Sequence, residues 1–315
     1  MRRHQSYNGL ACGERGAAAA IGNFDGVHLG HQSVIALARA AAAEIDAPLG
    51  IVTFEPHPRA FFAPNGPAFR LMDAEARAHR LAKLGVDQLY ELPFDAELAA
   101  LDAETFLRQV IAGGLVIRHL VAGADFRFGK GRGGDADLLR RLGPELGFGV
   151  TVAPLVTDAA GDYSSTAIRK ALTEGRPEDA ARMLGHWHRV EGEVLHGDKR
   201  GRDLGFPTAN LSLSGLHQPR FGVYAVIVDV LDGPHKGRHK GAASIGARPT
   251  FGVNVPNLEV HLLDFNGDLY GARISVALVA FQRPELKFDG VDALIARMAE
   301  DVLETRSRLA SLSQP

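Results

Sequence analysis

The stretch GNFDGVHLGH, residues Gly22–His31, decides the fold expected for the first half of the chain. An apolar run, Ala17–Ile21, comes immediately before it, and a long run rich in Ala, Leu, Val and Ile, Leu29–Ala43, overlaps its end. This order predicts a strand, a tight glycine turn and a helix. Such a turn directs backbone N–H groups and the positive end of the helix dipole at one point. We therefore expect phosphate to bind there.

Two histidines of this stretch, His28 and His31, are three residues apart and lie on one side of the predicted helix start. They could add hydrogen bonds or positive charge beside a polyphosphate, although a structural turn with surface histidines is the alternative. The chain has no Walker motif, because Gly129-Lys130 is followed by Gly131 and has the wrong spacing from Gly123. The pattern thus indicates a phosphate site that differs from a P-loop.

Bulk composition excludes several classes of protein. The length of 315 residues favours two domains, and 35 basic against 37 acidic residues leave no overall basic field for nucleic acid or an anionic membrane. A single cysteine, Cys12, rules out an intramolecular disulfide and a CxxC metal or redox site. No run approaches ~20 uninterrupted apolar residues, and the start lacks the apolar core of a signal peptide. We therefore expect a cytoplasmic protein.

The first half of the chain alternates short apolar runs with amphipathic segments. Expected strands lie at 17–22, 49–54, 88–92, 119–122 and 150–155, and expected helices at 31–45, 73–84, 103–113 and 136–146. This alternation predicts a parallel sheet covered on both faces, which binds ligands at the carboxyl ends of its strands. Polar turns at 54–59 and 123–129 also follow strands, so we expect them to meet the first turn at one edge.

The pattern changes near Gly185. A helical segment at 177–184 precedes β-rich runs separated by turn residues, at 190–195, 223–230, 242–245, 258–263 and 274–279. These runs predict an antiparallel sheet or small barrel. The last helix is amphipathic, with one apolar face formed by Val291, Leu294, Ile295, Met298 and Val302. We expect an α/β parallel-sheet (Rossmann-like) domain over residues 1–185, and a small antiparallel β-barrel domain with a C-terminal helix over 186–315.

Two further segments of the first half allow two interpretations each. Asp162 and Ser164 are typical of an N-cap that begins a helix. The segment Ser164–Arg169 could also present hydroxyls, N–H groups and Arg169 to phosphates, and both interpretations can hold at once. The glycine-rich stretch Gly129–Gly134 is either a cationic flap or a mobile loop.

The second half contains GDKRGRDLGFPTAN, residues 197–210. Glycines and bases suit a loop around phosphate, although this composition is also common in solvated turns. Pro207 fixes the backbone before Thr208 and Asn210, whose side-chain oxygens are hard ligands suited to Mg²⁺. Glu259 lies on an apolar strand; it is either a solvent-facing carboxylate or, if it faces Mg–ATP, a candidate general base for a hydroxyl nucleophile.

With these motifs the sequence resembles the bacterial bifunctional riboflavin kinase/FMN adenylyltransferase (FAD synthetase) family over nearly its whole length. Gly22–His31 is similar to the adenylyltransferase signature, and Arg200–Asn210 to the kinase signature RGRxLGFPTAN. Further segments match in order: Phe54–Arg59, Gly123–Gly129, Ser164–Arg169, Gly222–Ala225, Ser244–Gly252, Glu259–Phe265 and Arg283–Phe288. Ala167 stands where many relatives carry arginine, which removes one possible phosphate contact, and Arg248 stands where asparagine is also common.

The resemblance implies two reactions. The C-terminal domain would transfer the γ-phosphate of ATP to the ribityl hydroxyl of riboflavin, with Glu259 accepting the proton and Thr208 and Asn210 holding Mg²⁺ and ATP. The N-terminal domain would join AMP from a second ATP to FMN and release pyrophosphate. The phosphate of FMN is then the nucleophile, and His28, His31 and Arg169 stabilise charge by position and electrostatics.

The resemblance also implies binding residues and partners. The nucleotide-binding residues would be Gly22, Asn23, Phe24, Asp25, Gly26, Asp125, Arg127, Ser164, Ser165, Thr166, Gly205, Phe206, Pro207, Thr208 and Asn210. The flavin-side residues would be Phe54, Pro56, Pro58, Phe62, Phe128, Arg283, Glu285 and Phe288. We expect Mg²⁺, ATP, riboflavin, FMN and FAD as ligands, no nucleic acid or membrane partner, and a monomer or weak homo-oligomer.

Two other functions compete with this one. One is a nucleotidyltransferase for another small phosphate substrate with a regulatory barrel, which would have no need of Thr208, Asn210 and Glu259. The other is an RNA-binding barrel, since small barrels bind nucleic acid. Against it, basic residues in 186–315 are interleaved with acidic ones, and the aromatic residues form no regular series.

Overall fold

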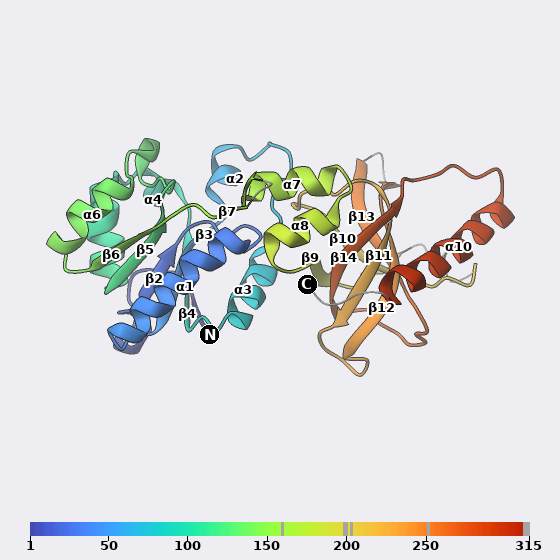
Figure 1. The fold of residues 1–315 in the computed structure, drawn as a ribbon, viewed down its shortest axis with the longest axis horizontal. Coiled ribbons are helices and arrows are strands. Elements are labelled where there is room, and N and C mark those ends of the chain that lie inside the picture. Colours follow the sequence, from blue (N-terminus) through green and yellow to red (C-terminus); the bar gives the residue numbers. More distant parts are fainter. Residues whose placement is uncertain (159–160, 198–200, 202–203, 251–252, 311–315) are drawn as a thin grey trace. The chain divides into compact units, whose positions relative to one another are not determined.

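A parallel sheet organises the first half of the chain (Figure 1). The computed structural model describes residues 1–158, 161–197, 201, 204–250 and 253–310. The strand order is β1-β4-β3-β2-β5-β6, and every neighbouring pair is parallel. The strands are β1 (Arg2–His4), β2 (Ala18–Ile21), β3 (Leu49–Glu55), β4 (Gln88–Pro93), β5 (His119–Gly123) and β6 (Gly149–Ala153). This confirms the expected Rossmann-like α/β fold.

Helices connect these strands and cover them. The helical elements are η1 (Cys12–Glu14), α1 (Leu29–Glu44), α2 (Pro58–Phe62), α3 (Ala74–Lys83), α4 (Ala96–Ala100), α5 (Ala103–Phe106), the π-helical η2 (Leu107–Gly114), η3 (Lys130–Arg132) and α6 (Ala136–Glu145). All four residues of β2 are buried, as expected for a central strand with both faces covered. From β2 the chain builds β3 and β4 on one side, and it then crosses to β5 and β6 on the other side. The carboxyl ends of β2 and β5 therefore mark the position where such sheets bind ligands.

An antiparallel sheet organises the second half. Its order is β10-β13-β12-β11-β14-β9, and every neighbouring pair is antiparallel. The strands are β9 (His188–Glu193), β10 (Ala209–Ser212), β11 (Gly222–Val230), β12 (Gly237–Thr250), β13 (Val253–Leu262) and β14 (Arg273–Arg283). Leu195 N–H donates to the Asn210 carbonyl across 2.9 Å, in an isolated bridge that links the two edges of the sheet. This nearly closes the sheet into the expected small barrel.

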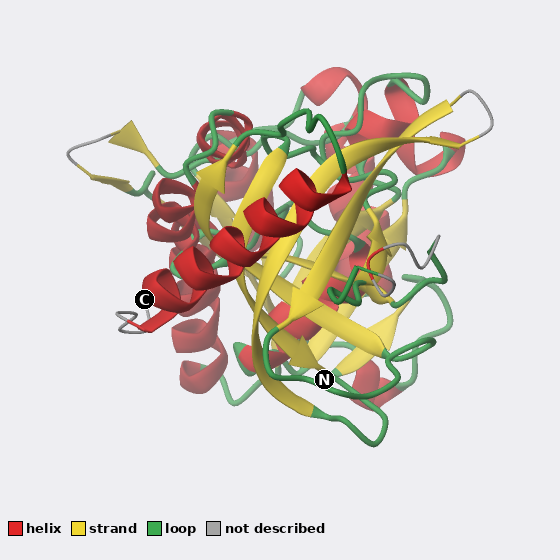
Figure 2. Cartoon of the chain, turned by 90° about the vertical axis from the view of Figure 1, so that its right-hand side faces the viewer, coloured by secondary structure: helices red, strands yellow, loops and turns green. Residues whose placement is uncertain are grey.

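Helix α10 (Val291–Ala310) packs against β11, β12 and β14, and Figure 2 shows it lying across the outside of these strands. The expected apolar face is buried only in part, because Val291 is 58% exposed. The fully buried positions include Asp301 and Thr305. The burial of Asp301 is explained by an ion pair, because Arg283 at the end of β14 binds its carboxylate with two hydrogen bonds of 2.8 and 2.6 Å.

The contacts of the chain group it into two units, Met1–Pro67 with Arg77–Tyr163, and Ala68–Ala76 with Ser164–Pro315. The short hairpin of β7 (Thr157–Asp158) and β8 (Gly161–Asp162) ends the first unit. Helices α7 (Ser165–Thr173) and α8 (Pro177–Leu184) belong to the second, together with the barrel. The domain boundary at residue 185 stays a prediction.

Candidate active sites

The turn after β2 is held in an uncommon backbone conformation. Phe24, Gly26 and Val27 have positive φ angles of 51°, 89° and 46°. Such angles cost a non-glycine residue of order 1–3 kcal/mol and persist where the surrounding structure imposes them. Here Phe24 and Val27 are completely buried, so their apolar burial offsets this cost. The sequence GNFDG thus forms a fixed turn at the carboxyl end of a central strand, as predicted.

Neighbouring elements hold this turn by hydrogen bonds. Thr53 of β3 donates its hydroxyl to the Asn23 carbonyl at 3.3 Å, and Gln32 of α1 donates its side-chain amide to the Val27 carbonyl at 2.9 Å. The Gly22 N–H donates to the carbonyl of Val52 in β3 at 3.1 Å. The turn is therefore fixed from both the sheet and the helix, which is the rigidity that a positioned phosphate needs.

The two signature histidines lie together at the start of α1. His28 is the N-cap, and its Nδ1 accepts a hydrogen bond of 3.3 Å from the His31 N–H. The two rings stack with their centroids 3.7 Å apart. A Cβ on Gly30 would come within 3.1 Å of the His28 ring, so any larger residue at position 30 would require the ring to shift. The spacing therefore brings the imidazoles together, as expected.

The environment of His31 sets its protonation state. Burial, and after it the neighbouring His28, lower the pKa of His31 well below its ordinary value. Its Nδ1 atom is buried and has no hydrogen-bond partner among the described residues. The ring is consequently neutral at pH 7 and offers one N–H donor, rather than a positive charge, to a ligand at the helix start.

A cluster of phenyl rings, the aromatic cluster, lies beside the turn after β3. Phe94 contacts the rings of Phe54, Phe61 and Phe62 at centroid distances of 5.7, 5.4 and 5.8 Å. Phe62 is 69% exposed, which leaves an apolar ring open to a planar ligand. The sequence predicted Phe54 and Phe62 as flavin contacts and missed Phe61 and Phe94. The signal for Phe94 was its place directly after a strand of the same sheet.

The two predicted prolines shape the entry to α2. Pro56 follows Glu55 through a cis peptide bond, and Pro58 is the first residue of α2. His57 caps this helix, because its Nδ1 accepts the Arg59 N–H at 3.0 Å. Both prolines therefore lie in the predicted turn, while their contact with flavin stays a prediction.

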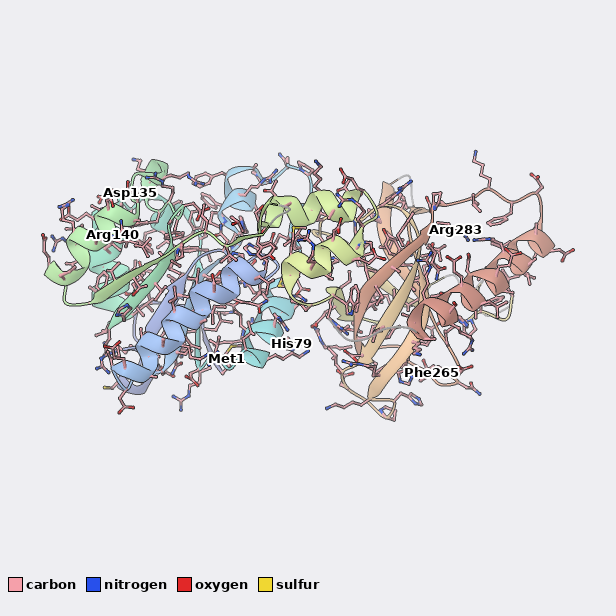
Figure 3. The ribbon with its side chains drawn as sticks, in the orientation of Figure 1. Met1, His79, Asp135, Arg140, Phe265 and Arg283 are labelled. Carbon is pink, nitrogen blue, oxygen red and sulfur yellow. The ribbon has the colours of Figure 1, made fainter. Side chains whose placement is uncertain are left out.

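The turn after β5 differs from its expected arrangement. Phe128 is buried in the core of the first unit, and Arg127 pairs with Asp135 at 2.9 Å instead of standing free. Asp135 caps α6, because its carboxylate accepts a hydrogen bond from the Leu138 N–H. This hydrogen bond, and after it the Arg127 guanidinium, lower the pKa of Asp135. Figure 3 labels Asp135 at this end of the unit. Asp125 is exposed, as a nucleotide contact requires.

Close packing requires two of the glycines in the stretch Gly129–Gly134. A Cβ on Gly129 or Gly134 would come within 2.6 or 2.7 Å of Ala103. The Lys130 N–H also donates to the Leu101 carbonyl at 2.7 Å. These contacts explain Gly129 and Gly134. Gly129 and Gly131 also have positive φ angles of 72° and 63°, which favour glycine.

The start of α7 confirms the N-cap interpretation. The Ser164 hydroxyl accepts the Ala167 N–H at 3.1 Å, and Ser165 begins the helix. Arg169 donates to the Thr166 hydroxyl at 3.3 Å and to the Phe69 carbonyl at 3.4 Å. All of these residues belong to the second unit, and their role toward phosphate stays a prediction.

On the outer face of the barrel, strand register brings together the residues predicted for the kinase. Asn210 of β10 lies directly opposite Glu259 of β13, and Ser244 of β12 lies opposite Glu259 on its other side. Leu211 and Leu258 belong to the barrel core, so their neighbours in sequence point outward. The amide and the carboxylate therefore share one face at adjacent strands.

Small contacts fix this pair. A Cβ on Gly197 would lie 2.5 Å from the Asn210 Nδ2, so the amide fills the space beside that glycine. Asn257 donates its side-chain amide to Glu259 Oε1 at 3.3 Å. Asn210 is only 8% exposed, whereas Glu259 is half-buried. The carboxylate is thus the more accessible of the two groups.

The loop before β10 contains the rest of the kinase signature. Phe206 N–H donates to the Gly201 carbonyl at 2.7 Å, and Gly205 has a φ of 86° that favours glycine. His261 Nδ1 donates to the Pro207 carbonyl at 2.9 Å, and the sequence did not single out this histidine. Its signal was the period-two spacing from Glu259. Thr208 is half-buried, two residues before Asn210, and Arg200 and Arg202 lie outside the described residues.

The segment after β14 gives a mixed result for the predicted flavin residues. The Arg283 guanidinium, labelled in Figure 3, is bound to Asp301 and lies 6.0 Å from the Phe288 ring. It therefore anchors α10. Glu285 is exposed and reaches Gly246, where an added Cβ would collide with its Oε1. Gly246 pairs with Asn257 across β12 and β13, so this carboxylate lies near the strand that carries Glu259.

Comparison with known proteins covers both halves of the chain. The FAD synthetase family model matches residues 12–167, and the riboflavin kinase family model matches residues 184–309. The chain is 42% identical to the bifunctional riboflavin kinase/FMN adenylyltransferase of Pseudomonas fluorescens, over 98% of each chain. It is 40% identical to the protein of that name from Escherichia coli K12, over 93% of each chain.

A solved structure matches the whole chain as well. A crystal structure described as a macrolide-efflux protein from Streptococcus pneumoniae covers 99% of each chain at a TM-score of 0.84 and 31% identity. In the part of this chain that the structure describes, no helix has both the length and the apolar character needed to span a membrane.

Proposed function

Because the chain belongs to the bifunctional riboflavin kinase/FMN adenylyltransferase family, we propose that it makes FAD in two steps at the two sites described above. The riboflavin kinase segment phosphorylates riboflavin with ATP, and the FAD synthetase segment then adenylylates the FMN that results. We also assign the residues that carry out each step. The observation that carries them most directly is the cross-strand pair of Asn210 and Glu259.

In the kinase step the ribityl hydroxyl of riboflavin attacks the γ-phosphorus of ATP and displaces ADP. Glu259 accepts the hydroxyl proton as the new O–P bond forms, which suits a half-buried carboxylate on the outer face. Glu285, close to the neighbouring strand, binds the flavin side. A regulatory barrel would need neither carboxylate.

Thr208 and Asn210 supply oxygen ligands of the type that Mg²⁺ prefers. In the described part of the chain, no three His, Cys, Asp or Glu side chains gather as a metal site. A site of few protein oxygens completed by water and phosphate fits this finding, because Mg²⁺ keeps several waters. When bound, Mg²⁺ neutralises charge on the phosphates of ATP.

In the adenylyl transfer step a phosphate oxygen of FMN attacks the α-phosphorus of ATP, and the bond to the leaving pyrophosphate breaks. The N–H groups of the turn at Gly22–His28 and the start of α1 stabilise the charge that develops. His31 donates one hydrogen bond as a neutral imidazole, and His28 orients it by stacking. The exposed ring of Phe62 in the aromatic cluster takes the isoalloxazine.

The test is a product assay with the purified chain, riboflavin, ATP and Mg²⁺, followed by chromatography. FMN should appear first and FAD after it, and supplied FMN should give FAD directly. Absence of both products would contradict the proposal. Phosphorylation without any FAD would refute the assignment of the first unit alone. The cytoplasmic location and the monomeric or weakly oligomeric state also stay predictions.

A further inference from the structure

A buried guanidinium lies under the sheet edge of the first unit and is not explained by the two reactions. Arg77 of α3 is only 1% exposed. Its Nη2 donates to Glu91 Oε1 at 2.9 Å and to Glu55 Oε2 at 3.0 Å. On the far side of Glu91, Arg3 donates to Oε2 through Nε and Nη2 at 3.0 and 2.8 Å. The four side chains form one array, which we call the charge array.

Stability alone is a poor reason for such an array. Taking two charges out of water costs several kcal/mol per ion, and apolar residues of similar volume often replace buried ion pairs without loss. Arg77 Nε is also buried and without a hydrogen-bond partner among the described residues, which costs about 1–3 kcal/mol. A group kept at this expense in the interior is better explained by what it positions.

The charge array ends at the ligand edge. The side chain of Glu91 is 2% exposed, whereas those of Glu55 and Arg3 are 33% and 32% exposed, so the array reaches the surface at Glu55 and at Arg3. Glu55 is the last residue of β3, at the carboxyl end of the sheet. The array carries two positive and two negative charges, so it brings no net charge to an edge that must accept phosphates.

Both parts of the adenylyl transfer site adjoin Glu55. Thr53, two residues earlier and on the same side of β3, donates to the Asn23 carbonyl in the glycine turn. The Glu55 carbonyl accepts the N–H of Phe94, the ring at the centre of the aromatic cluster, at 3.0 Å. A ligand that spans the turn and the cluster passes this carboxylate.

We propose that Glu55 is a recognition residue of the adenylyl transfer site and that Arg77 is its positioning residue. The inference rests on the proposed function of the first unit. A carboxylate attracts hydroxyl and N–H donors and repels phosphates, so it recognises the donor-bearing part of a co-substrate and not its phosphates. The ribose and adenine of ATP carry such donors, as do the ribityl chain and imide of FMN.

The experiment compares Glu55→Gln, Arg77→Met and a matched control, Arg3→Met, in the full chain. Arg3 is the member of the charge array that donates two hydrogen bonds to Glu91 from the side opposite Arg77. KM for ATP, KM for FMN and kcat are measured for FMN adenylylation, together with the thermal midpoint. Riboflavin phosphorylation by the same preparation reports the folding of the barrel.

We expect Glu55→Gln and Arg77→Met to raise the KM of the same co-substrate about tenfold, equivalent to about 1.4 kcal/mol. The KM of the other co-substrate and the kinase activity should stay within about twofold, and Arg3→Met should leave both KM values within that range. A raised KM for FMN identifies the flavin as the ligand of Glu55, and a raised KM for ATP identifies the nucleotide.

Unchanged KM values in Glu55→Gln would overturn the proposal. So would equal effects of Arg3→Met and Arg77→Met, because they would mean that the charge array acts only through stability. If Arg77→Met does not fold, the KM values of Glu55→Gln decide the outcome, because the Glu55 side chain is partly exposed and glutamine keeps its shape. Failure of the wild-type chain to convert FMN to FAD would instead contradict the proposed function.

Discussion

Gly197 leaves no room for a side chain beside the amide of Asn210. The Cβ of an alanine would lie 2.5 Å from Nδ2, about 0.9 Å short of ordinary contact at 3.4 Å. Asn210 is 8% exposed and held in β10 opposite Glu259, so the amide must move to relieve the overlap. A displacement near 1 Å in a positioning group can cost about 10²-fold in rate. We therefore expect Gly197→Ala to lower the kcat for riboflavin phosphorylation about 100-fold.

The matched control is Gly192→Ala in the neighbouring strand β9. Its Cβ would meet only Leu211 at 3.5 Å, an ordinary contact, so kinase activity should change less than about twofold. The assay follows FMN by chromatography under saturating riboflavin and ATP, and FAD formation from supplied FMN checks the first unit. Full kinase activity in Gly197→Ala would refute the role given to Asn210, as would equal losses in the two variants.

Two further predictions concern stability. Arg283 and Asp301 are 12% and 6% exposed at their side chains, so Asp301→Ala leaves the charge of Arg283 buried and unpaired by this carboxylate. We expect this variant to lower the free energy of unfolding, measured by urea titration, by about 3–5 kcal/mol. A change under about 1 kcal/mol would contradict the anchoring of α10. Burial, and after it the neighbouring His186 and His217, lower the pKa of His188 from 6.5 to about 3. Between about pH 6.5 and pH 3 the unfolded chain therefore binds a proton at this histidine that the folded chain does not. Stability should then fall by up to about 1.4 kcal/mol per pH unit between those values, and His188→Phe should flatten this part of the profile measured by urea unfolding.

Strand and helix periodicity predicted most of both sheets, and the exceptions have identifiable causes. Strand β1 consists of Arg2, Arg3 and His4, which carry no apolar signal; its pairing with β4 is a tertiary contact. Strand β10 is four residues long and begins at the end of the kinase signature, where the sequence was interpreted as a loop. Short edge strands depend on partners that are distant in sequence, so a local pattern does not show them.

The candidate sites show the same division between local and distant information. The His28–His31 pair follows from helical spacing, and the N-cap at Ser164 follows from its residue type. In contrast, the partner of Arg283 lies 18 residues away on another element, and Arg77 had no motif to mark it. Sequence therefore predicted candidate ligand-binding residues more readily than the residues that hold neighbouring elements in place.

Paired variants test most directly whether one chain carries two separate active sites. FMN formation from riboflavin and FAD formation from supplied FMN are measured side by side in Glu259→Ala and in His28→Ala with His31→Ala. We expect Glu259→Ala to abolish FMN formation and to keep the conversion of FMN to FAD. The double histidine variant should show the reverse. Loss of both activities in either folded variant would contradict two independent sites.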